Sequence, residues 1–267
     1  SPDTCDDLLC SCLTPLELVR YSLVCRDARR AVLSYCQRAY KLKRTLARFM
    51  SGDEVDRFQL LQSRTGAVIS GSTALQFLGR YDFIPTDLDI YVEHRYAKEI
   101  GRFLTVLGYH YEPRTSQPVL FSFALQRDER QATMWTVGGS EPYGSPAMCG
   151  AYNFVRPNNP DVRIQLITSR LSVMDIILDF HCTAVMNVIT HRNAFSLYPY
   201  ETFHAMRALV ARRRPGRREE EAFRKYSERG WHICRGVPRS ETDDPYEEFG
   251  QGTRRVGDEM SWTLPLS

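Results

Sequence analysis

Residues 66–75 read GAVISGSTAL and residues 86–92 read TDLDIYV, and these two stretches decide the fold. The first contains a short apolar run that predicts a buried strand over 67–70. Helical character returns over 73–79, ahead of a loop centred on Pro85. The second alternates with period two, which is typical of a strand with one covered face. We therefore expect an α+β fold in which helices flank a mixed sheet.

The turn after the first strand and the start of the second strand carry the residues suited to chemistry. Gly71 lets a phosphate approach the backbone, amides at the start of the next helix favour anionic oxygen, and Ser72 adds a hydroxyl donor. Asp87 and Asp89 are two residues apart on a strand, so both project from one face. Paired carboxylates suit Mg²⁺, which takes oxygen ligands together with substrate phosphates. A metal held there could align a triphosphate for in-line displacement.

The stretch from Gly71 to Arg80 and the Asp-x-Asp motif that follows it resemble the nucleotidyltransferase superfamily. The signature of that superfamily is Gly-Gly or Gly-Ser, a short helix and then Asp-x-Asp. The stretch is similar to the start of tRNA nucleotidyltransferases and equally to abortive-infection nucleotidyltransferase toxins. The resemblance implies that Gly71 and Ser72 contact a nucleoside triphosphate and that Asp87 and Asp89 bind magnesium or manganese. It also implies transfer of a nucleotidyl group to an acceptor, for which RNA and protein both remain open.

More closely, the chain resembles a group of proteins from mushroom-forming (basidiomycete) fungi. The similar blocks are residues 65–75, 87–92, 180–190 and 196–199. This resemblance spans most of residues 13–230, but it brings no biochemical activity with it.

Active members of the superfamily usually carry a third carboxylate on a later strand, beside the first two. The best matching strand is 162–168, and the matching position is Gln165. Asp161 shares the parity of Gln165 but lies about 13 Å away along a strand, so it cannot substitute directly. Asp175 or Asp179, on the following helix, could reach inward. Because an amide is a weak magnesium ligand and a poor base, the sequence leaves turnover undecided.

The N-terminal residues suggest a function of another class. Residues 13–17, LTPLE, followed by 23–26, LVCR, resemble the F-box pattern, in which helices dock a ubiquitin-ligase adaptor. The usual leading Leu-Pro is replaced here by Leu13-Thr14-Pro15, and Thr14 with Glu17 predicts a capping box. The interpretation that we favour is a helical layer packed on the sheet.

Three parts of the chain follow from these patterns. We expect an F-box-like helical segment over 1–50 and a nucleotidyltransferase-like domain over 51–230. Residues 231–267 lose periodicity and gain acidic, glycine and proline residues, which predicts a flexible tail.

The remaining landmarks complete the secondary structure that we expect. The pattern predicts strands around 120–123 and 133–136, a hairpin from 152 to 167, and a helix carrying apolar residues from 173 to 188. Polar residues lie on or just after that helix, and we interpret them as interior or capping groups in preference to a nucleotide pocket: His181, Asn187, His191 and Asn193.

Composition places the chain among ordinary globular proteins. Of its 267 residues 43% are hydrophobic and 25% charged, and the net charge of +3 is too small to indicate nucleic-acid binding by itself. No run approaches the roughly 18 apolar residues of a membrane span, so no membrane partner is expected. The scattered cysteines predict reduced thiols, and hence an intracellular location in the cytoplasm or nucleus. The two hypotheses are a nucleotidyl-transferring enzyme and a non-catalytic nucleotide-binding or F-box-like adaptor protein.

Overall fold

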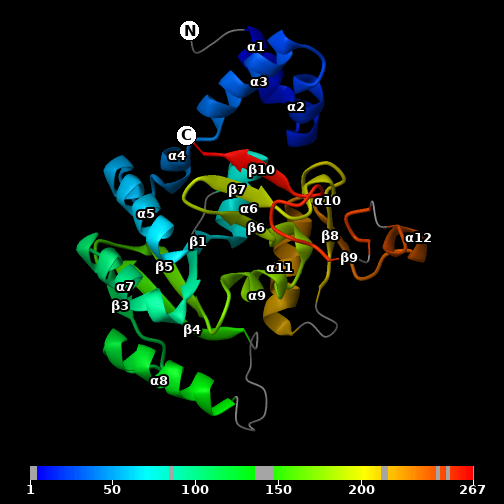
Figure 1. Ribbon diagram of the computed structural model, residues 1–267. Coiled ribbons are helices and arrows are strands. Elements are labelled where there is room, and N and C mark those ends of the chain that lie inside the picture. The colour runs from blue at the N-terminus through cyan, green and yellow to red at the C-terminus, as the bar shows by residue number, and fades with distance from the viewer. Residues whose placement is uncertain are drawn as a thin grey trace.

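The computed structural model describes residues 5–83, 87–135, 147–211, 216–244, 247–250 and 253–266. The loop expected around Pro85 lies outside these residues. Helices flank a large mixed sheet, as Figure 1 shows, so the α+β class expected from the sequence is confirmed. None of the helices in the described ranges is long and apolar enough to cross a membrane.

The helices are α1 (Cys5–Cys12), α2 (Pro15–Ser22), α3 (Arg26–Ala39), α4 (Leu42–Leu46), α5 (Gly52–Thr65), α6 (Gly71–Gly79), α7 (Ala97–Val106), α8 (Phe121–Trp135), α9 (Val173–Leu178), α10 (Pro199–Phe203), α11 (Arg217–Glu228) and α12 (Arg239–Thr242), with short 3-10 turns η1 (His94–Tyr96) and η2 (Thr183–Val185). The strands are β1 (Val68–Ile69), β2 (Asp87–Glu93), β3 (His110–Glu112), β4 (Met148–Arg156), β5 (Asn159–Ser169), β6 (Asn187–Ile189), β7 (Asn193–Ser196), β8 (Arg207–Leu209), β9 (His232–Cys234) and β10 (Trp262–Pro265).

The main sheet has eight strands in the order β10-β7-β6-β1-β2-β5-β4-β3. β2 lies near its centre, antiparallel to β1 and parallel to β5, while the other neighbours are antiparallel. A parallel pair needs a long connection, and here α7, β3, α8 and β4 intervene between β2 and β5. β8 and β9 form a separate parallel pair.

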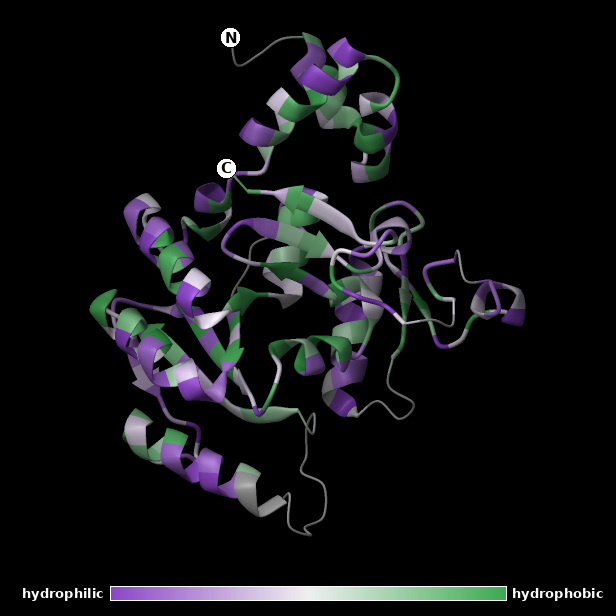
Figure 2. Ribbon diagram, in the orientation of Figure 1, coloured by the Kyte–Doolittle hydropathy of each residue, from purple (hydrophilic) through white to green (hydrophobic). Residues whose placement is uncertain are grey.

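The two faces of β2 are covered differently, which follows from its alternating sequence. Leu88, Ile90 and Val92 are fully buried in the larger core, to which α5, α6 and α7 also contribute. On the other face Tyr91 packs in a second core with Ile167 of β5 and with α9. The apolar strands and the more polar outer helices are visible in Figure 2. Asp87 and Asp89 share the face of Tyr91, as the period of two predicted.

Local sequence signals mark the start of α2, where the sequence predicted it, and the end of α5. Thr14 and Glu17 form the reciprocal capping box at the start of α2. α5 ends at Gly66, whose φ of +68° is readily adopted only by a residue without a Cβ. α1–α3 enclose a small core of their own around Leu18 and Val32.

The strands expected around residues 120–123 and 133–136 are wrong for the described residues, because residues 121–135 form the helix α8; residue 136 lies outside the described ranges. Its buried residues Ala124, Leu125 and Asp128 follow Phe121 at spacings of three, four and seven, which is the period of a helix. Phe121 packs against the place where a Cβ on Gly101 of α7 would lie. The glycine thus lets α7 and α8 approach closely.

The helix expected from 173 to 188 ends at Leu178, and Asn187 begins the central strand β6. Every residue from 182 to 189 is buried, and a fully buried apolar run can form a strand or a helix with equal ease. The placement of Asn187 and Asn193 on or after a helix is therefore wrong. Asn187 is nevertheless an interior residue, since its amide donates to Ala184 O at 2.8 Å.

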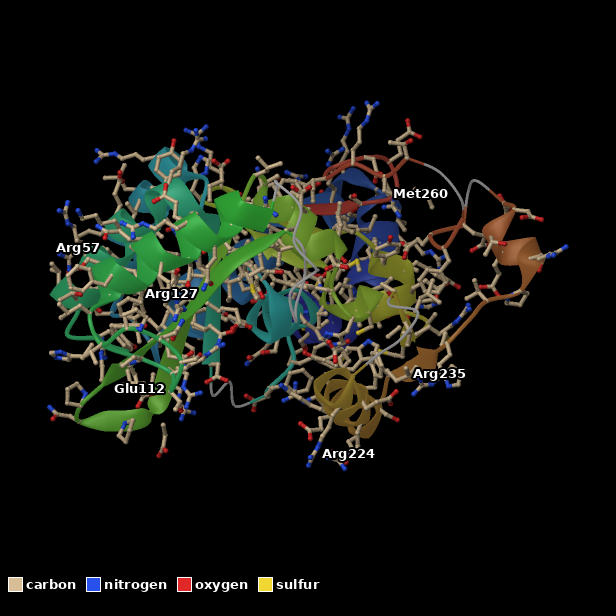
Figure 3. The ribbon with its side chains drawn as sticks, turned by 90° about the horizontal axis from the view of Figure 1, so that it is seen from below. Arg57, Glu112, Arg127, Arg224, Arg235 and Met260 are labelled. Carbon is tan, nitrogen blue, oxygen red and sulfur yellow. The ribbon has the colours of Figure 1, made fainter. Side chains whose placement is uncertain are left out.

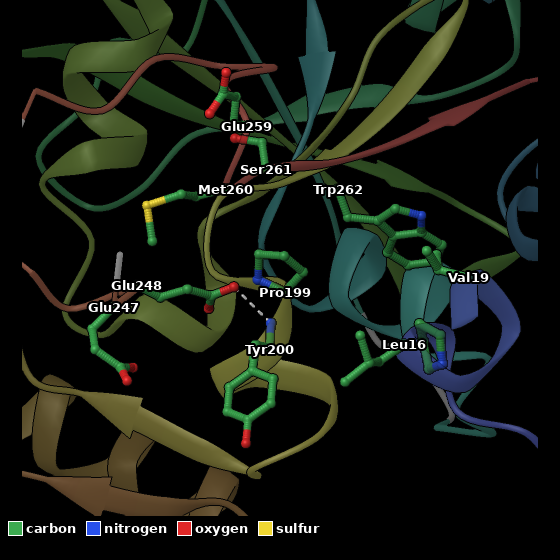
Figure 4. A pocket seen from close by; sticks show the side chains of 11 residues that line it. Leu16, Val19, Pro199, Tyr200, Glu247, Glu248, Glu259, Met260, Ser261 and Trp262 are labelled. Carbon is green, nitrogen blue, oxygen red and sulfur yellow. Dashed lines mark hydrogen bonds between the residues drawn. The ribbon is translucent and has the colours of Figure 1, made fainter. Parts of the chain in front are cut away.

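The flexible tail expected over 231–267 is also wrong for the described part of that segment. β10 pairs with β7 and forms one edge of the main sheet. Trp231 is 1% exposed, and its indole nitrogen donates to Thr202 O at 2.9 Å. Trp262 and Val19 of α2 both line a pocket of about 540 Å³ (Figure 4), so the C-terminal segment also borders the N-terminal helices.

Candidate functional site

The end of β1 and the first turn of α6 form one wall of the candidate site. The Ser70 backbone amide donates to Asp89 O at 3.3 Å, and the Ser70 hydroxyl donates to Asn187 O at 2.5 Å. Because that hydroxyl is engaged with β6, α6 has no side-chain cap at its N-terminus. The first amides of α6, which begin at Gly71 and Ser72, can therefore donate to an anion.

Asp89 lies directly against this turn. Gly71 has a φ of +69°, and a Cβ placed on it would be 2.9 Å from Asp89 Oδ2. The Thr73 hydroxyl donates to Asp87 O at 3.5 Å, which ties α6 to the start of β2. The fold thus brings Gly71 and the carboxylate of Asp89 together, although 18 positions separate them in the sequence.

β5 supplies the other side of the site. In the parallel register Asp87 is paired with Arg163 and Asp89 with Gln165, so the position expected for a third carboxylate lies beside Asp89. Gln165 Nε2 donates to Asn153 Oδ1 of β4 at 3.1 Å. The Gln165 side-chain oxygen can serve as a neutral ligand, but the amide cannot accept a proton as a carboxylate would.

The site is also shaped by a lysine from α11. Burial of the carboxylate raises the pKa of Asp89 to about 7; the charge of Asp87 also raises it, while Lys225 opposes the shift. The pKa of Lys225 is lowered by burial and by Arg229, and both aspartates act in the opposite direction. The raised pKa of Asp89 means that its ionised form is poorly stabilised without an added cation.

The other carboxylates considered for this site have different surroundings. Asp161 is exposed. Asp175 accepts a hydrogen bond from Ser172 N at 3.2 Å and caps its own helix. Asp179 lines a cavity of about 260 Å³ together with Gln165. Within the described ranges, no group of three or more His, Cys, Asp or Glu side chains is arranged to hold a metal ion.

That cavity extends the site along the shared face of β2 and β5. Tyr91 and Gln165 form its floor with Ile167, and Phe180 and His181 contribute further lining. Tyr91 and Phe180 have ring centroids 5.7 Å apart. Aromatic rings beside a side-chain amide suit the binding of a flat polar group. Asp89 is paired with Gln165 of this lining across the two strands.

Comparisons of the chain with protein-family models, with curated proteins and with solved structures gave no match. The assignment of the site therefore rests on its own geometry.

Two residues that contribute to the candidate site were not predicted from the sequence. Lys225 lies on α11, 136 positions after Asp89, and no local pattern connects the two residues. Asn153, the partner of Gln165, could have been found from the sequence, because the predicted hairpin of β4 and β5 already placed the two strands side by side.

Proposed function

We propose that this chain is a nucleotidyltransferase-fold protein that binds a nucleoside triphosphate with magnesium or manganese and transfers its nucleotidyl group to an acceptor. The observation that carries the proposal is the position of Asp89, which lies against the uncapped start of α6 and opposite Gln165. Phosphate oxygens would meet the amides of Gly71 and Ser72, and the metal would be held by Asp87 and Asp89.

The donor set fits such a cation. Two carboxylates share one strand face, and the pKa of one of them is raised to about 7 by burial and by its neighbour. When bound, the metal would neutralise charge on the phosphates and on the carboxylates. Oxygen from Gln165 and from the triphosphate itself would complete the ligands.

The transfer step makes clear what the site lacks. An acceptor oxygen forms a bond to the α-phosphorus, the bond to pyrophosphate breaks, and the acceptor loses its proton. Gln165 cannot take that proton, so Asp89, Asp87 or water must do so. Binding of the nucleotide without transfer is the non-catalytic alternative.

The test uses the full chain with each labelled nucleoside triphosphate, magnesium or manganese, and cellular RNA or protein as acceptor. The double variant Asp87→Ala, Asp89→Ala is compared with Asp161→Ala, which removes an exposed carboxylate on β5. We expect binding and transfer to be lost in the first variant and kept in the second. Nucleotide binding with no transfer to either acceptor would favour the non-catalytic protein. Transfer that persists in the double variant would refute the site.

A second candidate function is supported by the surface of the N-terminal helices. Leu23 and Val24 are 76% and 72% exposed, beside a helical core that is small. Apolar side chains so exposed are suited to binding a partner protein, and the F-box-like pattern suggests that the partner is a ubiquitin-ligase adaptor.

The test is retention of ubiquitin-ligase components by the full chain and by the double variant Leu23→Ser, Val24→Ser. The matched control is Val119→Ser, Leu171→Ser, which alters side chains that are equally exposed elsewhere. Equal retention by both variants, or none by the unaltered chain, would exclude an adaptor role for this surface.

A further inference from the structure

A basic pocket is lined by residues of α4, of the turn that follows it and of the C-terminal end of α6. Figure 1 shows α4 where the chain passes from helices α1–α3 into the rest of the protein. The volume of the pocket is about 420 Å³, and three arginines line it: Arg44, Arg48 and Arg80. Asp82 is the acidic residue in the lining. α6 begins at the candidate nucleotide site and ends at this pocket, so the two are separated by roughly 13 Å along the helix.

Arg80 occupies a backbone conformation that L-residues rarely adopt. It is the residue after α6, with a φ of +54°. Its guanidinium donates to Cys10 O at 3.2 Å and to the Tyr35 hydroxyl at 2.5 Å, and also to Leu13 O. Its Nε is buried without a hydrogen-bond partner. All these acceptors are neutral, so within the part of the chain that the structure describes Arg80 has no carboxylate among its hydrogen-bond partners.

Arg44 and Arg48 add two further cations to the lining. Both side chains are exposed, and within the described part of the chain neither takes part in an ion pair or a side-chain hydrogen bond. The adjacent Lys43 differs, because it pairs with Asp56 at 2.6 Å. Arg44 and Arg48 are four positions apart, close to one helical turn, and they border the same cavity.

We propose that this pocket binds a phosphate group. Three guanidinium groups against one carboxylate give a net positive site, and the planar fork of arginine matches the oxygens of phosphate. The Thr45 hydroxyl in the same lining can donate a further hydrogen bond. The phosphate can come from a small free anion or from the backbone of a nucleic-acid strand, and the chemistry recognised is the same.

The experiment measures binding of inorganic phosphate and of a short single-stranded oligouridylate, without magnesium or nucleotide. The variant Arg44→Gln, Arg48→Gln removes two cations from the pocket. The matched control Arg57→Gln, Arg64→Gln removes two exposed cations from α5; Arg57 is labelled in Figure 3. Both variants change the net charge equally. Within the described residues neither removes a side-chain hydrogen bond or an ion pair, so both are expected to melt as the unaltered chain does.

We expect the pocket variant to weaken oligouridylate binding about tenfold and the control less than about threefold. Loss of two phosphate contacts also reduces the slope of log affinity against log salt by about 1.4, since each contact to a single strand contributes about 0.7. If inorganic phosphate binds and depends on the pocket while the oligouridylate does not, the ligand is a small free anion. The proposal is overturned if neither probe binds, or if the control variant loses as much affinity as the pocket variant.

Discussion

Replacing Gln165 with glutamate would place a third carboxylate where the fold has an amide. Residue 165 is paired with Asp89 across two parallel strands, which lie about 4.8 Å apart. The new carboxylate would therefore lie about 6 Å from that of Asp89. Asn153 now accepts a hydrogen bond from Gln165, and its amide can rotate and donate to the glutamate, so no buried group need lose its partner.

The repulsion can be worked out from this separation. Two unit charges about 6 Å apart at an effective dielectric constant of about 20 repel by about 3 kcal/mol. Part of this is relieved because the pKa of Asp89, already raised to about 7, rises further and the group takes up a proton. We expect Gln165→Glu to cost about 1–3 kcal/mol without a divalent cation. For a chain of this size that corresponds to a fall in Tm of roughly 3–9 °C.

Thermal denaturation in EDTA and across a magnesium or manganese titration provides the assay. The control is Gln165→Met, which keeps the length of the side chain and removes the hydrogen bond without adding charge. The glutamate variant should recover its stability on adding the cation, with a larger rise in Tm than the unaltered chain or the methionine variant shows. Equal responses of all three proteins would refute the reasoning, because a carboxylate at position 165 and Asp89 could then not share one ion.

Three further predictions concern the site and its support. Because the pKa of Asp89 is raised from 3.8 to about 7, its contribution to stability is fully present below pH 3.8 and is lost as the pH rises through about 7. Without metal, the melting temperature of the unaltered chain should therefore fall between pH 5.5 and 8 by more than that of the Asp89→Asn variant. Equal falls in melting temperature for the two proteins would contradict this. Gly71→Ala should lower the free energy of unfolding by about 1–3 kcal/mol and weaken cation binding, because its Cβ would meet Asp89. Gly66→Ala, at nearly the same φ but with no atom near the new Cβ, should lower the free energy of unfolding and leave cation binding unchanged. Trp231→Ala should lower the free energy of unfolding in urea by about 3–5 kcal/mol, and a loss under 1 kcal/mol would mean that the C-terminal segment is loose.

The sequence predicted the parts of the site that depend on neighbouring residues. The alternation over 87–92 placed both aspartates on one face, because side chains on a strand alternate whatever surrounds it. Counting along the later strand identified Gln165, which the parallel register then paired with Asp89. The capping box of Thr14 and Glu17 was predicted in the same way, since it depends on two residues only three positions apart.

Only the tertiary structure decided the rest, because it depends on contacts between distant residues. An apolar run becomes a helix or a strand according to what covers it, and Asn187 begins β6 because β1 and β7 lie on either side. β10 is held by pairing with β7, which no pattern within residues 231–267 could reveal. Lys225 influences Asp89 because the fold brings α11 within electrostatic reach of the site. Charge, burial and strand pairing act through space, so the sequence by itself located the two aspartates, and the fold determined their surroundings.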